Sequence, residues 1–177
     1  MRVSQVYTAA PSEERCAVEM ETFALLDRLG IPYTWVAHDM ANTIEDCAAV
    51  DAALGISICK NLFLCNRQKT EFYLLAMPGD KLFQTKELSR QLGPARLSFA
   101  PPERMEALLG CAPGSASVLG MAYDKSHQVH LLMDREVYES EWFGCHPCKS
   151  DATLRIQTRD LLNIFFPYTG HPVTVVD

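Results

Sequence analysis

Apolar residues near the N-terminus recur at intervals of three or four, the spacing that places side chains on one face of a helix. These residues are Cys16, Met20, Phe23, Leu26 and Leu29. Ser12 is placed to cap this helix, with two acidic residues behind it in the first turn, and Gly30 ends it. A capping box that begins at Thr43 predicts a second helix, which ends at Gly55.

Several shorter stretches show the alternation or the apolar runs that are typical of strands. They span residues 33–37, 58–65, 71–77, 96–99, 118–122, 128–133, 153–157 and 173–176. Three more helices are predicted near residues 85–92, 101–110 and 158–166. Helices and strands are interspersed, and the polar turn at 66–70 makes one hairpin. The pattern favours a single α+β domain over residues 1–177, with a mixed and mostly antiparallel sheet flanked by helices.

Composition agrees with an ordinary globular protein. Charged residues make up 21% of the chain and the AVILMFWYC set makes up 48%. The first eight residues contain no apolar core of a secretory signal, and no apolar run approaches the ~18 residues that span a bilayer. We expect a soluble, cytoplasmic protein without a membrane partner.

The charge of the chain is unevenly distributed. The net charge of −6 argues against general binding to nucleic acid and against DNA as a partner. Residues 58–97, however, carry seven basic and three acidic side chains. Such a segment can bind a few phosphates, although a solvated surface with clustered charges would show the same pattern.

Seven cysteines are scattered along the chain, and Cys145 and Cys148 form a Cys-x-x-Cys pair. Such a pair can be a redox couple or half of a zinc site. The sequence contains no second Cys-x-x-Cys or His-x-x-x-His pair that would complete a zinc site, and no clear helix follows the pair. We therefore prefer incidental free thiols, and predict no metal and no cofactor.

Two adjacent polar residues, Lys60 and Asn61, interrupt an apolar strand. Adjacent side chains of a strand point to opposite faces, so one of the two is expected to face inward or into a cleft. An unpaired ammonium or amide is unfavourable there and usually has a partner or a ligand. Lys60 could equally extend along the surface to keep its charge in water. The pattern leaves both interpretations open.

Two further segments could contribute to a site. The loop Gly114-Ser115-Ala116-Ser117 has only small side chains, so a ligand could approach its main chain closely, although a plain connecting turn would have the same composition. His146 precedes a proline, which restricts its backbone to extended conformations and fixes the direction of its ring. A structural or surface histidine would look the same in isolation.

Five motifs taken together resemble those of the YbaK / prolyl-tRNA editing family. They are Lys60-Asn61-Leu62-Phe63-Leu64, Arg96-Leu97-Ser98-Phe99-Ala100 with Pro102-Glu103, Gly114-Ser115-Ala116-Ser117, His146-Pro147 with Ala152-Thr153, and Gly170-His171-Pro172 with Val175-Val176-Asp177. Their order and spacing agree with the family over about residues 20–177. The alanyl-tRNA(Pro) deacylase branch is the most similar.

The resemblance implies a hydrolase that cleaves the ester between an amino acid and the terminal adenosine of tRNA. It implies Lys60 and Gly114 as catalytic residues, with Lys60 at the acceptor end or its phosphate and Gly114 offering the backbone group nearest the ester. It implies Asn61, Ser115 and His146 as substrate-binding residues. In such enzymes main-chain groups of the glycine loop and a substrate hydroxyl position the attacking water.

The implied substrate is Ala-tRNA(Pro) or another small amino acid on tRNA(Pro), and prolyl-tRNA synthetase is a candidate partner. The chain departs from the family pattern at three positions. Val118 stands where proline is common, and Cys148 and Ser150 stand where leucine and asparagine are usual. These departures bear on which amino acid is removed.

Two other hypotheses remain at this stage. One is a non-catalytic module of the same fold that binds a tRNA acceptor stem or a synthetase, with salt-sensitive binding through the basic residues of 58–97. The other is a thiol or zinc protein centred on Cys145 and Cys148. Deacylation assays, metal analysis and thiol titration separate the three.

Overall fold

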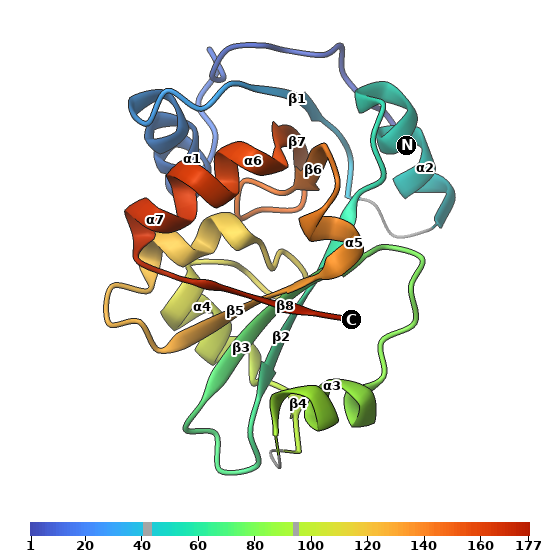
Figure 1. Ribbon diagram of the computed structural model, residues 1–177. Coiled ribbons are helices and arrows are strands. Elements are labelled where there is room, and N and C mark those ends of the chain that lie inside the picture. The colour runs from blue at the N-terminus through green and yellow to red at the C-terminus, as the bar shows by residue number, and fades with distance from the viewer. Residues whose placement is uncertain (41–43, 94–95) are drawn as a thin grey trace.

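Two β-sheets organise the chain in the computed structural model, which describes residues 1–40, 44–93 and 96–177 (Figure 1). The smaller sheet has three antiparallel strands in the order β1-β7-β6. Its strands are β1 (Tyr33–Ala37), β6 (Trp142–Cys145) and β7 (Ala152–Gln157).

The larger sheet is mixed and has five strands in the order β4-β2-β3-β5-β8. Its strands are β2 (Cys59–Cys65), β3 (Phe72–Pro78), β4 (Ser98–Phe99), β5 (Val129–Asp134) and β8 (Val173–Val176). Strands β4, β2 and β3 pair antiparallel, whereas β5 runs parallel to β3 and to β8.

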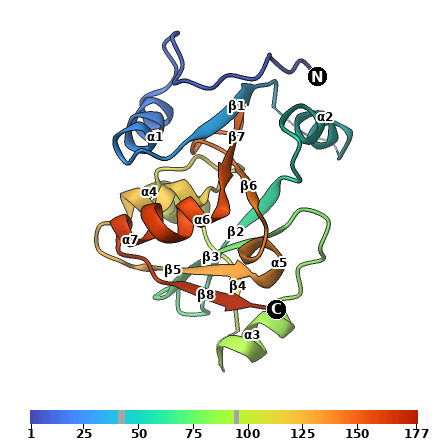
Figure 2. The same ribbon diagram turned by 45° about the horizontal axis from the view of Figure 1, so that its top comes forward.

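Helices connect and cover these sheets. The α-helices are α1 (Ala17–Arg28), α2 (Ile44–Leu54), α3 (Thr85–Leu92), α4 (Pro102–Leu109), α5 (Arg135–Tyr138), α6 (Thr158–Asp160) and α7 (Phe166–Thr169). A 3-10 helix, η1, spans Val118–Tyr123, and a π-helical segment, η2, spans Leu161–Phe165 between α6 and α7. Figure 2 shows α1 and α2 on opposite sides of β1.

The alternation of side chains along the strands divides the interior into three apolar clusters. The main cluster joins both sheets with α1, α4 and η1, and contains Phe23, Trp35 and Phe63. A second cluster lies under α3 on the other face of the larger sheet, and a third joins α2 to β1. On β2, Phe63 faces the main cluster and its neighbours Leu62 and Leu64 face the second.

The predicted single α+β domain with mixed and antiparallel strands is confirmed by this architecture. The predicted strand at 118–122 is wrong, because Val118–Tyr123 is the 3-10 helix η1 and Ser117 caps it by accepting a hydrogen bond from Leu119 N at 3.2 Å. Its residues form an apolar run of which four of six are buried, so periodicity could not separate helix from strand.

Other boundaries also differ from the prediction. Helix α1 begins at Ala17, and Cys16 occupies the N-cap position without a capping side-chain bond, so Ser12 is not the cap. Strand β6 and the short helix α5 were not predicted. The capping residue Thr43 lies outside the described residues. No helix within the described ranges is long and apolar enough to cross a membrane.

Candidate active site

Strand β2 places Lys60 and Asn61 on opposite faces of the larger sheet. Lys60 Nζ donates to the carbonyl oxygens of Gly79, at 3.3 Å, and of Lys81, both on the connection that follows β3. Asn61 points the other way, to the side of the main cluster. The two polar side chains of the strand therefore lie in different environments, one on each face of the sheet.

The amide oxygen of Asn61 is the polar side-chain atom of this strand that is buried without a partner among the described residues. Its Oδ1 atom is buried and accepts no hydrogen bond from any described residue. A buried amide without a partner is destabilising by about 1–3 kcal/mol, so folded proteins rarely keep one without a function. Its side chain lines a cavity, and the broad last torsion of an amide lets Oδ1 turn toward a ligand there.

Gly114 lies in a turn that also lines this cavity. Ser115 N donates to Ala112 O at 2.9 Å, and Gly114 has φ +80°. Proline followed by glycine with positive φ is the signature of a type II turn. The turn leaves the Gly114 N–H without an acceptor among the described residues, so a main-chain donor remains available for a ligand.

The cavity between Asn61 and Gly114 has a volume of about 200 Å³ and an apolar lining. The lining consists of Asn61, Leu62, Phe63, Phe99, Ala100, Pro102, Met105, Pro113, Gly114 and Ala116. Gly114 with its free main-chain donor and Asn61 with its unpartnered amide oxygen thus line the same small apolar space. Such a space can hold a small apolar group while the two polar groups orient a carbonyl and an amine.

Burial of Ser115 and the hydrogen bonds of Ser117 fix the position of this loop. Ser115 is buried, with 2% of its surface exposed. Ser117 Oγ donates to His146 O at 2.6 Å while it accepts from Leu119 N. The first bond ties the Gly114 loop to the segment that carries His146, and the second caps η1. This link between distant motifs was not predicted from the sequence.

His146 is held as a neutral imidazole. Its Nδ1 lies 2.8 Å from the carbonyl oxygen of Ala152, which can only accept, so Nδ1 carries the proton and Nε2 is free to accept. Burial lowers the pKa of His146, and the nearby His38 ring lowers it further against the opposing bond to Ala152. His38 accepts at Nε2 from Thr153 Oγ1 at 2.9 Å and was not predicted as part of this cluster.

We expect the His146 ring to titrate below its ordinary value of 6.5, because burial disfavours the charged form. Between the lowered and the ordinary pKa the unfolded chain binds more protons, so this residue reduces stability as the pH falls through 6.5. Ring NMR shifts followed against pH give the midpoint, with His146→Gln identifying the signal. A midpoint at or above 6.5 would contradict this environment.

The structure brings together Asn61 and Gly114, with Ser115 behind the loop and His146 joined to it through Ser117. It does not bring Lys60 to this cavity. The Lys60 ammonium uses two donors on carbonyls of the β3–α3 connection, where Lys81 also pairs with Asp134 at 2.8 Å.

Cys145 and Cys148 are both buried free thiols. Burial raises the pKa of Cys145, and a hydrogen bond with Cys111 together with burial raises the pKa of Cys148. Thiols in this state are poor nucleophiles. Within the described ranges no group of three or more Cys, His, Asp or Glu side chains is arranged to hold a metal ion.

A thiol titration should therefore show two classes of cysteine. Five of the seven cysteines are buried, and only Cys16 and Cys47 have substantial exposure. We expect at most two thiols to react with Ellman's reagent in the native protein and all seven after unfolding. Rapid reaction at Cys145 or Cys148, located by peptide mapping, would instead support a thiol function.

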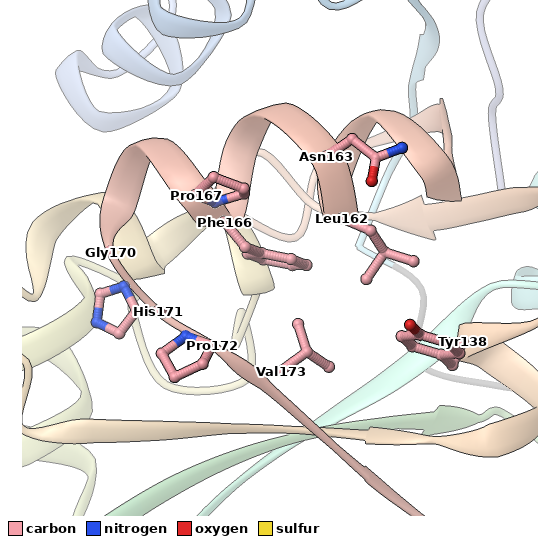
Figure 3. Close-up of a pocket in the computed structure, with 9 residues that line it drawn as sticks. All are labelled: Tyr138, Leu162, Asn163, Phe166, Pro167, Gly170, His171, Pro172 and Val173. Carbon is pink, nitrogen blue, oxygen red and sulfur yellow. The ribbon is translucent and has the colours of Figure 1, made fainter.

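A separate cavity of about 360 Å³ lies between the η2–α7 segment and β8 (Figure 3). Tyr138, Leu162, Phe166 and Val173 line it together with Asn163. It is larger than the Asn61 cavity but contains none of the site residues predicted from the sequence. None of its lining residues carries a buried polar atom without a partner.

The chain is similar in sequence to proteins that edit aminoacyl-tRNA. Residues 38–164 match the family described as the aminoacyl-tRNA editing domain. The prolyl-tRNA editing protein ProX of Acetoanaerobium sticklandii is 31% identical over 80% of this chain and 86% of its own length. The prolyl-tRNA synthetase associated domain-containing protein 1 of Danio rerio is 30% identical over 98% of this chain and 94% of its own length.

A solved structure of a candidate trans-editing enzyme for prolyl tRNA synthetase superposes with a TM-score of 0.66. The alignment covers 92% of this chain and 98% of that chain, at 16% sequence identity. At this identity the likeness concerns the fold alone.

Proposed function

The chain belongs to the aminoacyl-tRNA editing domain family, and we propose on that basis that it hydrolyses tRNA(Pro) that carries a wrong, small amino acid. The observation that carries the proposal is the cavity lined both by Asn61, whose buried Oδ1 has no partner among the described residues, and by Gly114, whose N–H has none. The apolar lining suits a small apolar side chain such as that of alanine. The name of the ProX relative supports tRNA(Pro) as the carrier.

In the proposed reaction, water attacks the ester carbonyl, a bond forms between the water oxygen and the acyl carbon, and the bond to the ribose oxygen breaks. The proton lost by water ends on that ribose oxygen, so the products are a free amino acid and intact tRNA. Gly114 N–H donates to the carbonyl oxygen as negative charge develops on it. Asn61 Oδ1 accepts from the α-ammonium group and fixes the acyl group.

An aminoacyl ester is already activated, so orientation of the carbonyl and of a water can provide much of the acceleration. This agrees with a cavity whose lining contains no side chain that titrates. Size excludes a larger amino acid more effectively than it could select among smaller ones. Phe63, Met105 and Pro102 form the apolar walls that set this limit.

The other site residues take supporting roles in the proposal. Ser115 and Ser117 hold the loop, and we assign neutral His146, which the Ser117 bond joins to the loop, to the wall behind the aminoacyl group. Lys60 lies on the other face of β2. Its ammonium group has three donors, and two of them are used on the carbonyl oxygens of Gly79 and Lys81. We assign the third donor to a phosphate of the tRNA backbone. Prolyl-tRNA synthetase is the proposed donor of the mischarged tRNA.

The test is the rate of ester loss from tRNA(Pro) charged separately with Ala, Ser, Cys and Pro. We expect rapid loss of one small amino acid and no acceleration for Pro-tRNA(Pro). Tight, salt-sensitive tRNA binding without turnover of any ester would instead establish the non-catalytic module.

A further inference from the structure

Buried polar atoms without partners are concentrated in two cavities. Among the described residues four such side-chain atoms occur: Thr34 Oγ1, Asn61 Oδ1, Arg155 Nε and Gln157 Oε1. Asn61 belongs to the site described above. The other three all line a second cavity of about 320 Å³ on the three-stranded sheet. Because folded proteins satisfy nearly all buried polar groups, three in one place indicate that a ligand supplies the missing partners.

The strand register places these groups side by side on one face. Thr34 of β1 lies opposite Arg155 of β7, and Gln157 of β7 lies opposite Trp142 of β6. Arg155 and Gln157 are two residues apart, so their side chains leave the strand in the same direction. The cavity shares no lining residue with the Asn61 cavity, so it is a separate site.

An aromatic ring and two arginines complete this cavity. The Arg155 guanidinium lies 4.3 Å from the centre of the Trp142 ring, and its Nη1 is fixed by donation to Leu54 O at 2.8 Å. Arg159 lines the cavity with 75% of its side chain exposed, and its ion pair with Asp160 is long, at 3.9 Å. Two guanidinium groups against one carboxylate leave the cavity locally positive in a chain of net charge −6.

We infer that this cavity is a nucleotide-binding subsite. Arg155 Nε requires an acceptor, Gln157 Oε1 requires a donor, and Thr34 Oγ1 can serve as either. The edge of a nucleobase presents adjacent donors and acceptors, and its plane stacks on an aromatic ring or on a guanidinium group. Arg159 is positioned for the phosphate. The inference rests on the proposed function in that a nucleotide of tRNA is then the natural occupant.

Trp142 makes a direct binding assay available. The probes are AMP, CMP, GMP and UMP, and uncharged tRNA(Pro), each titrated into the full chain while tryptophan fluorescence is recorded. We expect quenching that Trp142→Phe removes, since the second tryptophan, Trp35, is only 4% exposed. Gln157→Leu and Thr34→Val should each weaken binding about tenfold, the size of one base contact.

Charge variants test the phosphate contact. Arg159→Glu should weaken tRNA binding and reduce the salt dependence by about one ion, whereas Lys125→Glu, an exposed residue with the same change of charge, should not. Quenching by mononucleotides that depends on Gln157, with tRNA binding unaffected by the variants, would support the subsite and identify free nucleotides as its source. Equal affinity of all variants for every probe would overturn the inference.

Deacylation measured on the same proteins separates this inference from the proposed function. Wild-type turnover with unchanged probe binding in Gln157→Leu, Thr34→Val and Arg159→Glu would leave the function standing and remove the subsite. Loss of probe binding in these variants, with no ester hydrolysed by the wild type, would support the subsite and contradict the proposed function. If both hold, the variants should raise KM and leave kcat at saturation unchanged.

Discussion

Asn61→Leu is expected to lower kcat/KM for deacylation at least 100-fold while leaving the folded protein as stable as the wild type, or more so. Asn61 Oδ1 is buried without a protein partner, so an apolar side chain of similar size removes an unfavourable group from the free enzyme. The same change removes the acceptor for the α-ammonium group of the substrate. The loss of one oriented polar contact corresponds to about 3 kcal/mol in the transition state.

Single-turnover kinetics and thermal unfolding measure the two effects together. Asn163→Leu provides the matched control, because Asn163 is exposed and lines the cavity of Figure 3 rather than the proposed site. That variant should keep its activity. Loss of stability in Asn61→Leu without loss of activity would show that the amide serves the fold and not the substrate.

Gly114→Ala should lower deacylation by about 100-fold or more, with only a modest loss of stability. At φ +80° an L-residue is strained by about 1–2 kcal/mol, and a methyl group there meets no atom within 4 Å, so the fold accommodates it. The methyl group would project beside the N–H that we assign to the ester oxygen. If that oxygen is displaced by even a small distance, the Gly114 N–H no longer stabilises the negative charge that develops on it in the transition state.

Gly30→Ala separates this effect from backbone strain. Gly30 has φ +67°, and a methyl group there also meets nothing within 4 Å, but it follows α1 and lines neither proposed site. Both variants should lose similar stability in chemical denaturation. Only Gly114→Ala should lose activity, and equal activity losses would assign the effect to the fold.

The sequence predicted most strands because their apolar residues either alternate or form short bounded runs. Two of the elements that it mistook or missed illustrate the limit of that signal. Val118–Tyr123 is a short apolar run that forms a 3-10 helix, and β6 has only four residues in a stretch with acidic neighbours. The order of strands, with parallel β5 and β8 beside antiparallel β2 and β3, depends on long-range packing that periodicity does not contain.

In the candidate site, too, the local pattern predicted some features and long-range packing decided the others. Polar residues in the middle of an apolar strand indicated that Lys60 or Asn61 has a special role, but the local pattern could not say which of them faces the Gly114 loop. That choice follows from where α4 and the loop pack against β2. The Ser117 bond to His146 and the cluster of Thr34, Arg155 and Gln157 likewise join segments distant in sequence.

The most direct test of the site is to locate a stable substrate analogue on the protein. Alanine joined through an amide to 3′-amino-3′-deoxyadenosine keeps the acyl group, the ribose and the base but resists hydrolysis. We predict that its addition to ¹⁵N-labelled protein shifts the Gly114 amide and the Asn61 side-chain amide most strongly, with saturation at a common affinity. Shifts confined to the cavity of Figure 3 or to Trp142 and Arg155, with Gly114 and Asn61 unmoved, would contradict the assignment of the active site.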